Sequence, residues 1–138
     1  MSFLVVAATA AGCAGPSEEL RAESPGTPAV IRAESPGVVE EGKATYYSRR
    51  LIGRRTASGE RYDPALMTAA HHALPLGTRV RVTRLDVALP PVSVRINDRC
   101  AGVHKIIDLS EAAARRLQMM RAGIVPVRLE VLSGPRRP

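Results

Sequence analysis

The stretch Val94-Arg-Ile-Asn-Asp-Arg99 decides the interpretation of this chain, together with Ile106-Ile-Asp-Leu-Ser110. Apolar residues alternate along Val92–Ile96, which predicts a strand with one buried face leading directly into Asp98. Lys105–Leu109 predicts a second, buried strand that carries another acidic residue. Acids where short strands meet loops are commonly placed for chemistry, so both stretches become candidates for a functional site.

The elements around these two stretches are also short. Strands are predicted over Ala44–Ser48, Arg79–Leu85 and the alternating run 125–131. One helix is predicted over Glu111–Met120, because the hydroxyl of Ser110 can accept hydrogen bonds from first-turn amides. About six short strands with one short helix are typical of a mainly β protein built as a small barrel.

Composition divides the 138 residues into four parts. The apolar run Phe3–Ala11 is too short to cross a bilayer as a stable helix and indicates an export signal over residues 1–13. Residues 14–41 are rich in Pro, Gly, Ser, Ala and Glu, repeat Arg-Ala-Glu-Ser-Pro-Gly and predict a flexible linker. We expect the globular domain over residues 42–133 and a short basic tail over 134–138.

The apolar run ends in Ala10-Ala11-Gly12-Cys13, which resembles the lipobox of bacterial lipoproteins. We therefore expect lipidation of Cys13 and an exported, periplasmic protein anchored in a membrane. Ala14 offers no acidic retention signal, which favours the outer membrane. The competing interpretation is an ordinary secretory signal in which Cys13 is incidental. Acylation of Cys13 would leave Cys100 as a lone thiol.

Charge is concentrated in the predicted domain. The net charge is +7, yet residues 14–41 hold two Arg against six Glu, and the rest from Gly42 holds eighteen Lys and Arg against seven acids. Such a domain suits an anionic partner. Nucleic acid is not the expected one, because three Tyr, one Phe and no Trp leave little to stack on bases. A basic nucleic-acid binder stays a remote alternative.

The sequence predicts no cofactor and no metal. Its three histidines and Cys100 lack the spaced pairs that zinc sites show. A glycine-rich phosphate-binding loop is also not found in the printed sequence.

Further motifs occur in a fixed order across the domain, namely Gly53-Arg-Arg-Thr-Ala-Ser-Gly-Glu60, Leu66-Met-Thr-Ala-Ala-His71 and Leu74-Pro-Leu-Gly-Thr78. With the two opening stretches they resemble the rare lipoprotein A (RlpA) family over about Gly42 to Leu132. The resemblance implies a double-psi β-barrel and an endolytic lytic transglycosylase, which cleaves β-1,4 bonds between N-acetylmuramic acid and N-acetylglucosamine and leaves 1,6-anhydro ends. Its substrate, peptidoglycan, is anionic, which suits the basic domain.

The resemblance also implies which residues act. Asp98 matches the family's catalytic Asp, which would protonate the leaving oxygen and then take a proton from the muramic acid 6-hydroxyl. Glu60 and His71 match residues tied to activity, and Asp108 is the second candidate acid. Each has a competing structural interpretation. For Asp98 this is an ion pair with Arg99 or the capping of a turn, and for Glu60 a solvated loop position. For His71 it is a buried ring bonded to backbone, and for Asp108 a structural role at the helix start through Ser110.

Five further residues are candidates for substrate binding. Tyr47 and Tyr62 can stack on sugars, although core packing competes as an explanation. Arg95 and Arg99 can bind lactyl carboxylates, although solvated strand arginines are common. Asn97 completes the Asn-Asp-Arg motif that carries the resemblance.

The chain departs from the family after this motif, where Cys100-Ala101 stands in place of the usual Gly-Pro. That loop shapes the surroundings of Asp98, so a non-catalytic peptidoglycan-binding or expansin-like wall module is the alternative function. We expect a monomer. We also expect no second, glycan-binding repeat domain (a SPOR domain) of the kind that many family members carry after the barrel.

Overall fold

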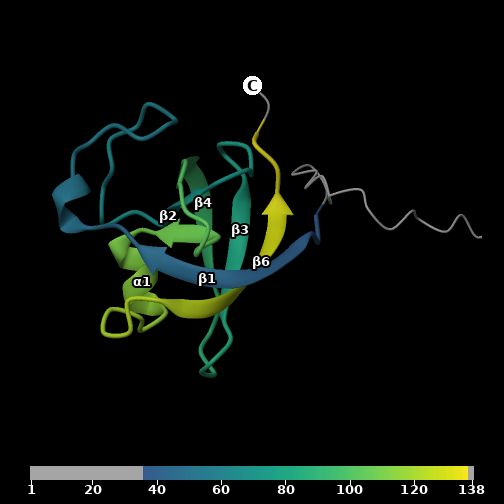
Figure 1. The fold of residues 1–138 in the computed structure, drawn as a ribbon. Coiled ribbons are helices and arrows are strands. Elements are labelled where there is room, and N and C mark those ends of the chain that lie inside the picture. The colour runs from purple at the N-terminus through teal and green to yellow at the C-terminus, as the bar shows by residue number, and fades with distance from the viewer. Residues whose placement is uncertain (1–35, 137–138) are drawn as a thin grey trace, which may run out of the picture.

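The chain folds into a closed β-barrel, seen in a computed structural model that describes residues 36–136 (Figure 1). Its elements are β1 (Val39–Tyr46), the 3-10 helix η1 (Arg49–Leu51), β2 (Thr68–His71), β3 (Arg79–Arg84), β4 (Val92–Asp98), β5 (Ile107–Leu109), α1 (Glu111–Arg116) and β6 (Val125–Ser133). Around the barrel the strands follow the order β1-β5-β2-β4-β3-β6. The predicted mainly β fold, a six-stranded double-psi barrel, is therefore confirmed.

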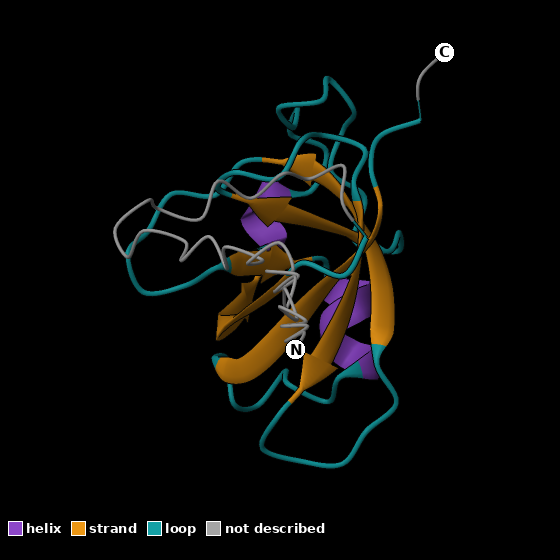
Figure 2. Cartoon of the chain, turned by 90° about the vertical axis from the view of Figure 1, so that its right-hand side faces the viewer, coloured by secondary structure: helices purple, strands orange, loops and turns teal. Residues whose placement is uncertain are grey.

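Strand pairing is mixed. β1 pairs with β5 and β2 pairs with β4 in parallel, whereas the other four neighbouring pairs are antiparallel. Figure 2 shows the strands enclosing one interior, with the helical segments behind them. The alternating residues of β3, β4 and β6 fill this interior, and Val80, Val94 and Val127 are among its fully buried side chains. Burial of such side chains is the main stabilising contribution to the fold.

Several element boundaries differ from the expectation, and two of the differences are the largest. β1 begins at Val39 and pairs with β6 from there, so the last three residues assigned to the linker, 39–41, belong to the barrel. α1 ends at Arg116 rather than at Met120, and Gln118 follows it with a positive φ of 52°. The left-handed conformation at residue 118 ends the helical path before the predicted apolar face is complete.

The expected signal over residues 1–13, the lipidation site Cys13 and most of the predicted linker lie outside the described residues. Within residues 36–136, we find no helix with the length and apolar character that a membrane span needs.

A β-bulge determines where Asp98 points. In the pairing of β2 with β4, Ala69 lies opposite Ile96, but Ala70 lies opposite Asp98, so Asn97 is an extra residue in β4. Ala69 and Ile96 are core residues, whereas Ala70 packs in a separate cluster outside the core. Strict alternation after Ile96 would send Asp98 inward. The bulge turns it to the outer face, as bulges beside functional sites often do.

A substitution at Ser110 tests whether its hydroxyl stabilises the first turn of α1 as a helix cap. Its buried hydroxyl accepts from the backbone N–H of Ala113 at 3.3 Å. We expect Ser110→Ala to lower the free energy of unfolding by about 1 kcal/mol in urea titrations, because a first-turn amide loses its partner. Ser133→Ala, at an exposed strand end, is the matched control. Equal stability of the two variants would contradict a capping role.

Candidate active site

Asp98 is held at the outer face of the barrel by three donors. Its Oδ1 accepts from the backbone N–H groups of Ala57 and Arg99, both at 2.8 Å, and its Oδ2 accepts from the hydroxyl of Tyr47 at 2.7 Å. None of these donors is a cationic side chain, and the residue is half-buried. A carboxylate can accept about four hydrogen bonds, so Oδ2 keeps an acceptor position for another group.

Asp98 belongs to a row of four side chains that crosses four strands. Thr45 of β1 pairs with Asp108 of β5, Asp108 pairs with Ala70 of β2, and Ala70 pairs with Asp98 of β4. Paired residues of neighbouring strands project from the same face of a sheet. The small side chain of Ala70 therefore separates the two acids on one outer surface.

Asp108 is brought to the site, but as one partner of an ion pair. Its Oδ1 accepts from Thr45 Oγ1 at 2.8 Å, and its Oδ2 lies 2.9 Å from Lys105 Nζ. The side chain is only 12% exposed. The structural interpretation of Asp108 predicted a contact with the helix start through Ser110. The structure shows the ion pair described above in its place.

The rings of Tyr47 and Tyr62 pack against each other beside Asp98 and are buried. Their ring centroids lie 4.5 Å apart, and the two residues are 7% and 4% exposed in a small cluster with Ala70. Packing occupies both rings, as the competing interpretation predicts, and stacking of either ring on a sugar stays a prediction. Burial and the hydrogen bond to Asp98 raise the pKa of Tyr47 far above its ordinary value, so its phenol stays protonated and donates to Asp98.

Glu60 meets two of the predicted substrate-binding residues. Its Oε2 accepts from Arg95 Nη2 at 2.9 Å and from Asn97 Nδ2 at 3.1 Å. These hydrogen bonds hold the pKa of Glu60 below its usual value, so the side chain, 46% exposed, stays ionised. Glu60 can thus accept a hydrogen bond from a ligand but is a poor proton donor. Its loop reaches β4 through Ser58 N–H, which donates to the carbonyl of Asn97.

His71 is fully buried and uses both ring nitrogens within the protein. Nδ1 accepts from the backbone N–H groups of Ala73 and Leu74, each at 3.0 Å, which places the ring proton on Nε2, facing Glu40 Oε2 at 3.0 Å. The ring thus bonds to backbone groups, as the competing interpretation predicts, and its part in activity stays a prediction. Burial lowers the pKa of His71 and keeps the ring neutral.

The guanidinium of Arg99 also forms hydrogen bonds with backbone groups. Its Nη1 donates to the carbonyls of His71 and Leu74, at 3.2 and 2.6 Å. The expected contact with a lactyl carboxylate is thus replaced, at this nitrogen, by contacts that fix the end of β4 to the turn after β2. Asp98 accepts from the Arg99 backbone N–H and not from its guanidinium, so the predicted competing ion pair is not what holds the acid.

One group of side chains has the spacing of metal ligands. Ligand atoms of Glu40, His71 and His72 lie within 4.8 Å of one another. A metal on Nε2 of His71 would require the ring proton on Nδ1, where two backbone N–H groups already donate. The arrangement therefore does not fit a metal site.

Several supporting residues were not singled out from the sequence. Thr45, Lys105 and Ala70 flank the two acids, and the Ala57 amide donates to Asp98. The sequence carried no signal for the ion pair of Lys105 with Asp108, because side chains three residues apart point to opposite faces of a strand, and a backbone donor such as Ala57 leaves no signal either. Cys100 is a free, half-buried thiol beside the tyrosine cluster, and burial raises its pKa.

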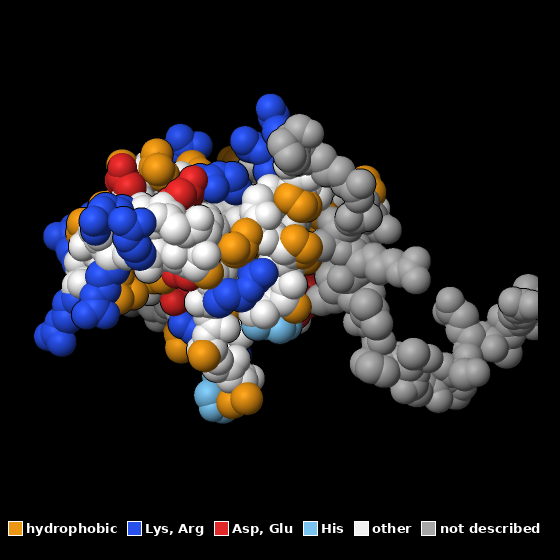
Figure 3. Space-filling model, turned by 90° about the horizontal axis from the view of Figure 1, so that it is seen from above, with side chains coloured by type: hydrophobic (Ala, Val, Ile, Leu, Met, Phe, Trp, Pro, Cys, Tyr) orange, Lys and Arg blue, Asp and Glu red, His pale blue; other side chains and the backbone are white. Residues whose placement is uncertain are grey.

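Basic side chains crowd one side of the molecule. The segment 49–61 carries five exposed arginines: Arg49, Arg50, Arg54, Arg55 and Arg61. Figure 3 shows Lys and Arg side chains gathered at the left end of the face, the side on which Figure 1 places η1. The site therefore has an electropositive neighbourhood that attracts anionic ligands.

Comparison with known proteins now defines the family. Residues 39–129 match the family described as "Lytic transglycolase". A "Probable endolytic peptidoglycan transglycosylase RlpA" from Nostoc sp. is 52% identical over 95 residues, which are 67% of this chain and 25% of that protein. An "Endolytic peptidoglycan transglycosylase RlpA" from Vibrio cholerae is 44% identical over 99 residues, 70% of this chain and 37% of that protein.

The chain therefore belongs to the lytic transglycolase family, and the resemblance to RlpA is confirmed. It spans well under half the length of these two relatives.

Two solved structures share the fold. The Streptomyces papain inhibitor has a TM-score of 0.58 at 24% identity, covering 72% of this chain and 98% of the inhibitor. A mutant expansin of Clavibacter michiganensis, solved in complex with cellohexaose, has a TM-score of 0.55 at 26% identity, covering 73% of this chain and 54% of the expansin.

The buried His71 predicts how stability depends on pH. In the unfolded chain its pKa returns to about its ordinary 6.5, above the folded value. As the pH falls below about 7, the unfolded state binds more protons, so the free energy of unfolding should drop by up to about 1.4 kcal/mol per pH unit until the folded pKa is reached.

Urea unfolding of the barrel domain at several pH values between about 5.5 and 7.5 measures this dependence. We expect His71→Gln to be less stable than the wild type but to lose most of the pH slope. His72→Gln, an exposed neighbour, should keep it. A slope unchanged in His71→Gln would show that other groups cause the effect.

Proposed function

We propose that this protein is an endolytic peptidoglycan lytic transglycosylase with Asp98 as its catalytic acid and base. The supporting observation is the half-exposed carboxyl of Asp98, oriented by Tyr47, Ala57 and Arg99 while a position on Oδ2 stays available. Membership in the lytic transglycolase family and the names of the RlpA relatives support the same reaction.

The proposed reaction uses one carboxyl twice. Protonated Asp98 gives its proton to the glycosidic oxygen as the bond from C1 of muramic acid to that oxygen breaks. The resulting carboxylate then takes the proton of the muramic acid 6-hydroxyl, whose oxygen bonds to C1 and closes the 1,6-anhydro ring. No water is consumed, and the acid returns to its starting state. This differs from hydrolysis with two cooperating carboxyls.

Other groups around Asp98 have supporting roles in this proposal. Tyr47 positions the carboxyl through its protonated hydroxyl. Ionised Glu60, on the loop that carries Ala57, accepts hydrogen bonds from substrate hydroxyls beside Arg95. Asp108 contributes charge balance with Lys105 rather than proton transfer.

A second candidate is a wall-binding, expansin-like module without catalysis. It is favoured by the likeness to an expansin whose title includes a bound cellohexaose. It is also favoured by Cys100, which packs against the tyrosine cluster next to Asp98. Both candidates predict glycan binding, so product formation separates them.

Asp98→Asn is the direct test of the reaction. We expect it to abolish release of 1,6-anhydro-ended fragments from peptidoglycan strands, measured by mass spectrometry, while pull-down with the same strands is retained. An amide can accept the substrate's hydrogen bonds but cannot donate and regain the required proton.

The matched control is Asp86→Asn, which removes an exposed acid paired with Arg84 on the β3–β4 connection. It should leave the product yield unchanged. Full activity of Asp98→Asn would remove this residue from the mechanism. Wild-type binding without any anhydro product would favour the wall-binding module.

We also propose that the protein is exported and held at a membrane, through acylation of Cys13, facing the periplasm from the outer membrane. The support is the apolar run Phe3–Ala11 that ends in Gly12-Cys13. Residues 14–35 come next, and their Pro- and Gly-rich composition is suitable for a tether. The end-to-end distance of a flexible chain is of the order of 5–6 Å times the square root of its number of residues.

Cys13→Ser tests this anchor. Expressed at full length in a Gram-negative host, the wild type should sediment with outer membranes and incorporate radiolabelled palmitate, because two or more acyl chains anchor a protein stably. The serine variant should lose the label and the sedimentation. Cys100→Ser, the matched control, should keep both. An unlabelled wild type would indicate an ordinary secretory signal.

A further inference from the structure

Two arginines lie directly opposite each other on the outer face of the barrel. Arg79 of β3 is paired with Arg95 of β4, and both side chains face outward, because the next pair along, Val80 and Val94, is buried in the core. Opposite residues of an antiparallel pair have Cα atoms about 5 Å apart, and like charges in that position destabilise the sheet. Folding alone therefore gives no reason for this pair.

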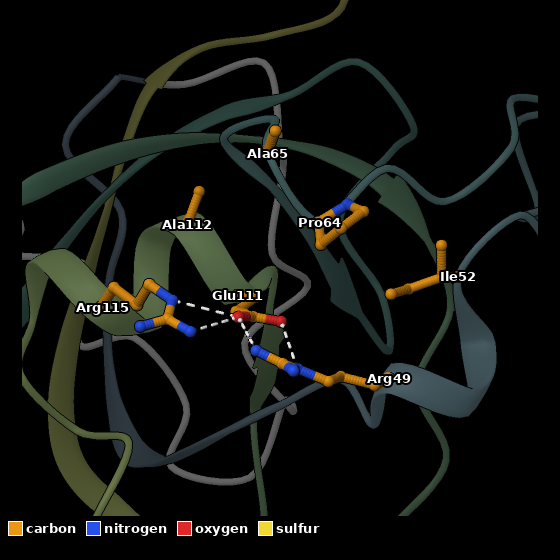
Figure 4. Close-up of a pocket in the computed structure, with 7 residues that line it drawn as sticks. All are labelled: Arg49, Ile52, Pro64, Ala65, Glu111, Ala112 and Arg115. Atoms are coloured by element: carbon orange, nitrogen blue, oxygen red, sulfur yellow. Dashed lines mark hydrogen bonds and ion pairs between the residues drawn. The ribbon is translucent and has the colours of Figure 1, made fainter.

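Only one charge of the pair is compensated within the described range 36–136. Arg95 Nη2 donates to Glu60 Oε2 at 2.9 Å, whereas the exposed side chain of Arg79 forms no ion pair or hydrogen bond with any residue of that range. Elsewhere on the surface two arginines that lie close together share an acid, as Figure 4 shows for the two that flank Glu111. All the guanidinium donors of Arg79 can thus bind an anion from solution.

The arginine pair lies on the same outer face as Asp98. Arg95 and Asp98 belong to one strand, and three residues of extended chain span at most about 10 Å. The loop that donates to Asp98 through the Ala57 amide also contacts Arg95 through Glu60. A chain of sugars that extends from Asp98 along β4 therefore meets the two guanidinium groups.

We propose that Arg79, assisted by Arg95, binds the lactyl carboxylate of a muramic acid in the glycan strand on which Asp98 acts. This inference rests on the proposed function and adds the chemical group by which the substrate is recognised. A guanidinium is a planar donor that can form two parallel hydrogen bonds with a carboxylate. Because Glu60 already accepts from Arg95, the substrate carboxylate is expected on the side of Arg79.

The pair would distinguish an anionic glycan from a neutral one. Each muramic acid of a peptide-free strand carries a lactyl carboxylate, whereas a β-1,4 glycan without muramic acid carries none. A bound carboxylate would also compensate the charge of Arg79, which is the charge that the protein leaves without a partner in the described range.

Stability distinguishes a binding role of Arg79 from a structural one. Arg79→Gln removes the repulsion between the opposed guanidinium groups, so urea unfolding without ligand should show a variant at least as stable as the wild type. A clear loss of stability would show that this arginine supports the fold and would overturn the argument from the opposed charges.

The binding test uses one ligand in two forms. A tetrasaccharide of alternating N-acetylglucosamine and N-acetylmuramic acid is prepared with free lactyl carboxylates and with these groups converted to neutral methylamides. Titration calorimetry is carried out with Asp98→Asn, which leaves the ligand uncleaved. We expect this protein to bind the carboxylate form about three-fold to ten-fold more tightly than the amide form. The double variant Asp98→Asn/Arg79→Gln should bind both forms with the weaker affinity.

Arg116→Gln in the same Asp98→Asn background is the matched control. Arg116 is an exposed arginine beside residues 90–92, at the opposite end of β4 from Asp98, so the substitution removes the same charge away from the site. It should keep the preference for the carboxylate form. Equal affinity of Asp98→Asn for the two forms, binding of neither, or an equal loss in the control would overturn the proposal.

Product formation separates this inference from the proposed reaction. Wild-type protein is incubated with peptide-free glycan strands that carry either lactyl carboxylates or the methylamides, and anhydro-ended products are quantified. We expect faster release from the carboxylate strands. Equal rates on both would contradict the carboxylate site and leave the reaction in place. Charge-dependent binding without any anhydro product would support the site and contradict the reaction.

Discussion

The carboxylate of Asp98 joins the end of its own strand to two segments that lie 41 and 51 residues earlier in the sequence, and the arrangement of the site depends on those contacts. Tyr47 reaches it from the end of β1, Ala57 from the long loop before β2, and Arg99 from the end of its own strand. Because the bulge at Asn97 aims the acid outward, the loop and the tyrosine can converge on it from outside the barrel. The three hydrogen bonds hold the segments around Tyr47, Ala57 and Arg99 in place, and these segments in turn fix the position of the Asp98 carboxylate. These contacts would preorganise the carboxyl for the reaction proposed above.

Sequence patterns predicted the parts of the fold in which one face is buried and the other is solvated. β3 and β6 alternate between buried and exposed residues, so their period was visible. β2 is buried at all four of its positions and has no alternation to detect. The bulge in β4 was not predictable either, because Asn97 looks like any other strand residue until the register with β2 is known. The site could therefore be listed by residue, but the direction of its key side chain could not.

Three of the residues predicted to act at the site share a physical property. Tyr47, Tyr62 and His71 can all bind sugars, and all three are buried, with their polar atoms satisfied inside the protein. A buried aromatic ring with a polar atom must find a partner, and here those partners are the acid, a helix amide and a turn. Residue type and order along the chain identify such residues as important. They do not distinguish a side chain that touches a ligand from one that holds its neighbours in place, because that difference lies in solvent exposure.

The acidic residues around the site differ in the kind of hydrogen-bond donor that contacts each carboxylate. Glu60 meets Arg95, Asp108 meets Lys105, and Glu111 meets two arginines. A cation beside a carboxylate favours its ionised form, as the lowered pKa values of Glu60 and Glu111 indicate, which makes those acids poor proton donors. Asp98 meets a phenol and two backbone amides, which orient it without adding a charge. The cations of this basic protein thus contact the other acids and the surface, and neutral donors surround the carboxyl that we propose as the acid and base.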